Sequence, residues 1–142
     1  MNKFAKIKKI CQEYDITLAY LFGSKVKEGL KILNNEIIEI NDPLSDLDFG
    51  LVFKNEGSIK KSYKLYSELY NLFSDIFLPL KLDLVFLQEN HSVFQSQAFL
   101  GECIYYDDEE FKDNYEDRIL ARAADFKYVL DKYYEERMEE MI

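Results

Sequence analysis

The chain has no long apolar run, few cysteines and a single histidine, and each scarcity excludes a class of protein. No stretch of about 18 uncharged apolar residues occurs, which argues against a membrane span. The N-terminus leads into lysines rather than into the apolar region of a signal peptide, so we expect a soluble, cytoplasmic protein. Cys11 and Cys103 lack metal-ligand spacing, so we expect reduced thiols rather than a disulfide framework or a zinc site.

Acidic residues outnumber basic ones, and most of the excess lies near the C-terminus. The formal net charge is -9, and residues 107–142 hold 13 acidic and 6 basic side chains, which accounts for -7 of it. A nucleic-acid-binding protein needs a basic face that neutralises phosphates, so we expect no direct contact with nucleic acid. Two basic clusters occur: Lys3, Lys6, Lys8 and Lys9, and then Lys25, Lys27 and Lys31. The second cluster follows Gly23-Ser24 and could bind a nucleotide, with a solvated helix or loop face as the alternative for both.

Alternating strand and helix patterns predict one α/β (α+β) domain. A chain of 142 residues, 48% of them hydrophobic, is long enough to bury a single core. Apolar runs predict central strands at 16–22, 47–53 and 80–87, and a short extended piece at 103–106. Helical spacing predicts helices at 3–14, 59–77, 92–100 (with Ser92 as a candidate cap) and 108–138, the last as one helix or two. We therefore predict a small mixed sheet with packed helices, in which residues 1–142 form one domain and residues 108–142 are its C-terminal helical extension.

The predicted C-terminal helix carries apolar residues that a small domain has little surface left to cover. They are Phe126, Leu130, Tyr133, Tyr134 and Met138. An uncovered aromatic face at this point would be a surface for a partner protein, and ordinary packing within the domain is the alternative.

Three aspartates occupy or adjoin strands that are otherwise apolar. Asp46 and Asp48 are two residues apart at the start of a predicted strand, so their side chains leave the same face. Asp83 interrupts the run 82–86, which would otherwise be a buried strand, and an unpaired carboxylate there would be costly. If the two strands are neighbours, the three carboxylates converge, and a hard divalent cation such as Mg²⁺ compensates their repulsion. The alternatives are a turn-capping role for Asp46 and a buried basic partner for Asp83.

Gly23-Ser24 directly follows the first predicted strand. Glycine lets the backbone approach a ligand closely, and a helix that starts just after it would point free N–H groups at phosphate. Neither G-x-x-x-x-G-K-[ST] nor G-x-G-x-x-G occurs in the chain, so P-loop and Rossmann sites lack their essential residues.

These segments together resemble a known family. Leu21–Ser24, Ser45–Val52 and Leu82–Val85 resemble the polymerase β-like nucleotidyltransferase superfamily, most closely its minimal nucleotidyltransferase members, and the likeness covers nearly the whole chain. The ending, from Tyr115–Arg118 to Tyr133-Tyr134, looks like the C-terminal helix of antitoxins paired with HEPN-type ribonuclease toxins. The resemblance implies the palm-like nucleotidyltransferase fold.

The resemblance also implies a role for each site residue. Gly23 and Ser24 would hold the triphosphate of ATP, with Lys25 and Lys27 as further nucleotide contacts. Asp46 and Asp48 would bind two Mg²⁺ ions, and Asp83 would bind one metal and help activate the attacking hydroxyl. The implied reaction is transfer of AMP from ATP to a tyrosine of a HEPN toxin, which silences the toxin within a hetero-oligomer.

Two other functions share this donor site. One is a small-molecule nucleotidyltransferase of the aminoglycoside-modifying type, and the other is an antitoxin that acts by binding alone. The chain also departs from the compact family pattern, because residues 25–45 are about ten residues longer and could form a hairpin or a flap. His91, the lone histidine, is interpreted as a loop or helix-cap residue rather than as a base.

Overall fold

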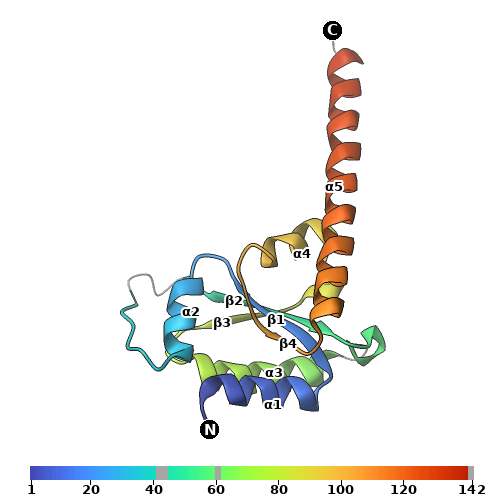
Figure 1. Ribbon diagram of the computed structural model, residues 1–142. Helices are drawn as coiled ribbons and strands as arrows, with labels where there is room; N and C mark the ends of the chain where they lie inside the picture. Colours follow the sequence, from blue (N-terminus) through green and yellow to red (C-terminus); the bar gives the residue numbers. More distant parts are fainter. Residues whose placement is uncertain (41–44, 60–61, 141–142) are drawn as a thin grey trace.

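The computed structural model describes residues 1–40, 45–59 and 62–140, and it has a four-stranded sheet with helices on both faces (Figure 1). The strands are β1 (Ile16–Phe22), β2 (Leu47–Phe53), β3 (Leu82–Phe86) and β4 (Glu102–Tyr106). Their order is β3-β2-β1-β4; β1 pairs antiparallel with β2 and β4, whereas β2 and β3 are parallel. The predicted mixed α+β sheet is therefore confirmed.

One face of the sheet is covered by α1 (Lys3–Glu13), α2 (Val26–Leu33) and α3 (Ser62–Phe77), and α1 and α3 lie side by side (Figure 1). The main core lies between these helices and alternate strand residues. Phe49 of β2, for example, packs its ring 4.7 Å from that of Phe73 and 5.4 Å from that of Phe77. Residues facing this core are large and apolar because they are buried on the pleat of a central strand.

The other face is only partly covered, by α4 (Ser92–Ala98) and the first turns of α5 (Glu109–Glu140). A smaller core forms there, in which Leu18, Tyr20 and Val52 of the sheet meet Tyr115 and Ile119 of α5. Two short 3₁₀ turns, η1 (Glu56–Ile59) and η2 (Leu87–Glu89), connect the elements around it. Asp48 and Asp83 belong to the strands that share this face, where the helices leave a pocket.

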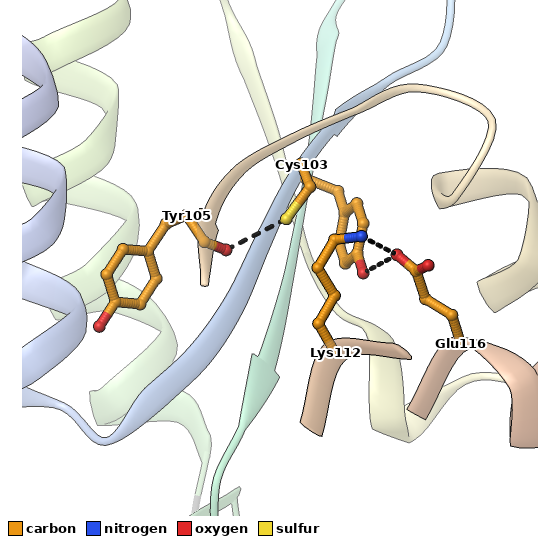
Figure 2. A network of polar contacts seen from close by, with 5 residues as sticks. Cys103, Tyr105, Lys112 and Glu116 are labelled. Atoms are coloured by element: carbon orange, nitrogen blue, oxygen red, sulfur yellow. Dashed lines mark hydrogen bonds and ion pairs between the residues drawn. The ribbon is translucent and has the colours of Figure 1, made fainter. Parts of the chain in front are cut away.

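Polar contacts anchor the start of α5 to the sheet. The Tyr20 hydroxyl donates to Glu116 at 2.6 Å. Lys112 forms an ion pair with the same carboxylate at 3.2 Å (Figure 2). The Tyr115 hydroxyl donates to the buried side chain of Gln95 in α4. Beyond these turns α5 leaves the body of the protein and projects as a single straight helix (Figure 1).

The predicted elements exist, and several bounds differ. The strands at 16–22 and 47–53 are confirmed, whereas β3 is shorter than predicted and lies at the edge of the sheet rather than in its centre. The C-terminal helix is one element, not two. The cap of α4 is His91, whose side chain accepts from the amide of Val93, so the cap expected at Ser92 is wrong and the interpretation of His91 as a cap is confirmed.

The long segment after Gly23 begins with a helix. After α2, Asn35 adopts a positive φ of 59°, and residues 36–40 carry no strand, so the described part of the segment forms no hairpin. Residues 41–44 lie outside the described residues. Within the described ranges, no helix is long and apolar enough to cross a membrane.

Candidate active site

Gly23 ends β1 in a conformation that favours glycine. Its φ is +79°, and a Cβ at this position would overlap the carboxylate of Asp48. The close approach is possible because Phe22 and Asp48 are partners across β1 and β2. Because Gly23 has no side chain, the turn before α2 can lie directly against the Asp48 carboxylate on the neighbouring strand.

Asp48 and Asp83 face each other across the parallel strands β2 and β3. They are register partners, and their carboxyl groups share a hydrogen bond. Burial is the largest cause that raises the pKa of Asp48, and the hydrogen bond to Asp83 and the charges of Asp83 and Asp46 add to it, giving a pKa of about 6. The prediction that these two strands are neighbours is confirmed.

Asp83 itself is exposed, which corrects the expectation of a buried carboxylate in a buried strand. The reason is the position of β3 at the sheet edge: Leu82, Leu84 and Phe86 enter the core, whereas Asp83 points to the face that α4 and α5 leave open. In the described residues the ion pair of Lys112 with Glu116 is the only one, so Asp83 has no basic partner there. The alternative of a buried basic partner has no support in this part of the chain.

Asp46 is half-buried just before β2, and its charge reaches Asp48, but it does not line the pocket that contains the other two. Among residues 1–40, 45–59 and 62–140, no three histidine, cysteine or acidic side chains are grouped for a metal ion. The donor set nevertheless fits Mg²⁺, which binds oxygen and takes one or two carboxylates together with water and substrate phosphates. Below about pH 6 a proton on Asp48 relieves the repulsion of this pair, and at higher pH such a cation would take that role.

The pocket has a volume of about 620 Å³ and lies between the strand ends and α4. Gly23, Asp48 and Asp83 line it, so these three residues, which the sequence predicts to share a site, lie around one pocket. Six residues that were not predicted from the sequence also line it: Val26, Phe94, Gln97, Leu100, Gly101 and Glu102. They come from α2, α4 and the start of β4 with the turn before it, and no local motif marks them.

The remaining predicted nucleotide contacts lie beside this pocket rather than in its wall. Ser24 is exposed in the turn, Lys25 is the N-cap residue of α2, and Lys27 is exposed on that helix. Val26, the first residue of α2, does line the pocket. The helix therefore begins at the pocket, where its free N–H groups are available to an anion.

Several solved structures share this fold. A chain in the crystal structure of a mutant toxin-antitoxin pair, MntA-HpeT, matches with a TM-score of 0.62 at 14% identity, over 97% of this chain and 99% of that chain. A chain in a toxin-antitoxin structure with AMP-PNP has a TM-score of 0.60 at 15% identity, over 97% and 99%. A chain in the structure of a tri-AMPylated Shewanella oneidensis HEPN toxin in complex with MNT antitoxin has a TM-score of 0.58 at 14% identity, over 96% of both. No curated protein sequence matches the chain.

A family match agrees with the geometry of the site. The family described as Polymerase beta, Nucleotidyltransferase matches residues 5–110. That range holds the Gly23 turn, β2 with Asp48, β3 with Asp83 and the α4–β4 wall of the pocket. The chain therefore belongs to the polymerase β family of nucleotidyltransferases.

Proposed function

We propose that the chain transfers AMP from ATP, with Mg²⁺, to a tyrosine hydroxyl of a HEPN-type ribonuclease toxin and thereby acts as its antitoxin. The observation that carries this proposal is the Asp48–Asp83 pair: the two are register partners on β2 and β3 and line one pocket with Gly23, which lies against the Asp48 carboxylate. A carboxylate pair beside a helix start suits a ligand that brings both a divalent cation and phosphates. Nucleoside triphosphate with Mg²⁺ is such a ligand.

Each group of residues would have a separate role in this reaction. Asp46, Asp48 and Asp83 would hold the two Mg²⁺ ions, which supply charge neutralisation at the reacting phosphate and at the leaving pyrophosphate. Gly23, Ser24 and the first amides of α2 would hold the triphosphate, with Lys25 and Lys27 close by. Asp83, exposed at the sheet edge, is placed to accept the proton of an incoming hydroxyl.

The acceptor is proposed to be a protein, and α5 (Glu109–Glu140), whose second half projects from the body of the protein, offers a surface for one. Structures of this fold include a HEPN toxin that carries AMP and is bound to an MNT antitoxin, and another with AMP-PNP. For this chain we propose a HEPN toxin as the acceptor and ATP as the donor.

Binding of ATP is expected to require a divalent cation. Three carboxylates near the pocket repel a triphosphate until Mg²⁺ or Mn²⁺ neutralises them. Isothermal titration calorimetry with the full chain should therefore give measurable ATP binding with Mg²⁺ and at least about tenfold weaker binding in excess chelator. Equal affinity in both conditions would contradict the metal-site interpretation.

Transfer itself is the test of the function. We expect the reading frame next to that of the chain to encode a small helical protein with an Arg-x₄₋₆-His motif. Incubation of this HEPN protein with the full chain, Mg²⁺ and α-labelled ATP should place label on a tyrosine and reduce ribonuclease activity. Label on an added aminoglycoside instead would favour the small-molecule enzyme, and neutralisation of the ribonuclease without label would favour an antitoxin that acts by binding alone.

A further inference from the structure

The projecting half of α5 carries an apolar stripe that is largely open to solvent, although the guanidinium of Arg137 lies over the ring of Tyr133. We call Phe126, Val129, Leu130, Tyr133 and Tyr134 the α5 stripe. Their three- and four-residue steps continue the face on which Tyr115 and Ile119 are buried. Yet every residue from Ala124 to Glu140 is exposed, and Tyr133 and Tyr134 keep 51% and 58% of their surface in solvent. The face that packs on the body in the first half of the helix is thus open in the second half.

The stripe differs sharply from the rest of the projecting helix. Phe126 marks its base, where the ring lies 4.4 Å from that of His91, the cap of α4. The side of the helix opposite the stripe is mainly acidic, with Asp131, Glu135 and Glu139. An amphipathic helix with a charged outer side suits packing of its apolar side against another helix.

A second feature lies at the base of the stripe. Arg118 and Arg122 are one helical turn apart, Arg122 is one turn before Phe126, and both arginines line a polar pocket of about 330 Å³. The guanidinium of Arg118 lies 5.2 Å from the ring centre of Tyr115, and neither arginine forms an ion pair within the described residues. Glu56 also lines this pocket without pairing with them. Two arginines with no anionic partner, next to an open apolar stripe, suit a carboxylate presented by another molecule.

We infer that the α5 stripe is the docking surface for the HEPN partner, which would pack one apolar helix face along it and place an acidic side chain against Arg118 and Arg122. This inference rests on the proposed function for the identity of the partner. The solved structures with this fold match over 96–97% of the chain, so the shared fold includes most of the projecting helix.

The position of the stripe relative to the active site supports this assignment. Helix α4 packs on α5, and its residues Phe94 and Gln97 form a wall of the pocket that holds Asp48 and Asp83. Because Phe126 at the base of the stripe contacts His91, the cap of α4, a partner helix seated on the stripe would end near α4, from which a neighbouring segment can reach the pocket. Docking on α5 would hold the acceptor hydroxyl close to the donor nucleotide without occupying the donor site.

Tyr133→Asp should weaken binding of the full chain to the HEPN protein at least about tenfold, because it places a charge in the middle of a desolvated apolar contact. The matched control is Tyr128→Asp: Tyr128 is 64% exposed on the same helix, but it lies on the side opposite the stripe, so its replacement should change the affinity less than about threefold. A second pair of variants reverses a positive charge. Arg122→Glu should weaken binding to the HEPN protein, whereas Lys132→Glu, on the opposite side of the helix, should leave the affinity nearly unchanged. Calorimetry would measure the affinity, and circular dichroism would confirm that each helix is intact.

The outcomes separate this inference from the proposed function. Equal binding by the Tyr133→Asp and Tyr128→Asp variants would overturn the docking surface even if AMP transfer occurs. Stripe-dependent binding without AMP transfer would retain the surface and reject the enzymatic function. A dimer of the chain alone, detected by light scattering and dissociated by Tyr133→Asp, would assign the stripe to a second copy and overturn the inference, as would absence of any binding to the HEPN protein.

Discussion

Replacement of Asp83 by asparagine should reduce AMP transfer about 100-fold or more. Asp83 lines the pocket and is exposed at the sheet edge, and we propose that it binds Mg²⁺ there and takes a proton from the acceptor. An amide is a poor Mg²⁺ ligand and a negligible base, so both contributions are lost together. The measurement is transfer of label from ATP to the HEPN protein. A variant within about tenfold of wild type, a barrier change of about 1.4 kcal/mol, would remove Asp83 from the proposed site.

The same variant should not damage the fold. In the wild type the pKa of Asp48 is raised from 3.8 to about 6, so the folded apo chain keeps a proton that the unfolded chain releases near pH 4. This group therefore stabilises the fold below about pH 4, and that contribution is lost as the pH rises to about 6. Asp83→Asn removes one neighbouring charge and so lowers the pKa of Asp48 in the folded chain. The stability that is lost when Asp48 ionises therefore becomes smaller, and at pH 8 the variant should be as stable as wild type or slightly more so.

The thermal midpoint of the apo chain between pH 4 and pH 8 measures this effect, with the metal removed by chelator. A structural role for Asp83 beside a buried cation makes the opposite forecast, since the cation would be left unpaired at a cost of about 3–5 kcal/mol. A large drop in midpoint at pH 8 would therefore reject the carboxylate-pair interpretation independently of the activity measurement.

Local sequence pattern was sufficient to predict most of the helices and strands and to select Asp48 and Asp83, which line one pocket. A run of seven buried residues in β1, ended by a glycine, has few structural alternatives, and the bounds of β1 and β2 agree with the prediction. Asp48 and Asp83 were detectable because a carboxylate within an apolar strand needs a physical reason. Their mutual contact followed once the two strands were assumed to be neighbours, and the register supports it.

Sheet order and the far wall of the pocket depend on contacts between residues distant in sequence. The apolar run around Asp83 does not distinguish a central strand from an edge strand. The spacing of apolar residues indicates which face of a strand is buried, but it does not indicate whether one or two strands pair with it. Phe94, Gln97 and Glu102 reach the pocket only because the chain returns through α4 and places β4 antiparallel beside β1. Their residue types are ordinary, so no sequence signal could have selected them.

Among the residues of the pocket wall that were not predicted from the sequence, we expect replacement of Gly101 to reduce stability most. A Cβ on Gly101 would overlap the carbonyl oxygen of Leu21 and would lie 2.8 Å from the Cα of Phe22, both in the backbone of β1. That strand pairs on both sides and is buried throughout, so it cannot move aside cheaply. We expect Gly101→Ala to lower the free energy of unfolding by about 2–3 kcal/mol. Because Gly101 also lines the pocket, binding of ATP with Mg²⁺ should weaken as well.

Gly57→Ala is the matched control for this change. Neither glycine has a positive φ, so backbone strain does not separate them, and the nearest atom to a Cβ at Gly57 is the end of the flexible Asn55 side chain at 3.2 Å. Gly57→Ala should therefore change stability by less than about 0.5 kcal/mol. Urea unfolding of the three proteins gives the comparison, with the slope of the transition checked for constancy. If Gly101→Ala were as stable as Gly57→Ala, the turn into β4 would not be pressed against β1, and the wall of the pocket would lie elsewhere.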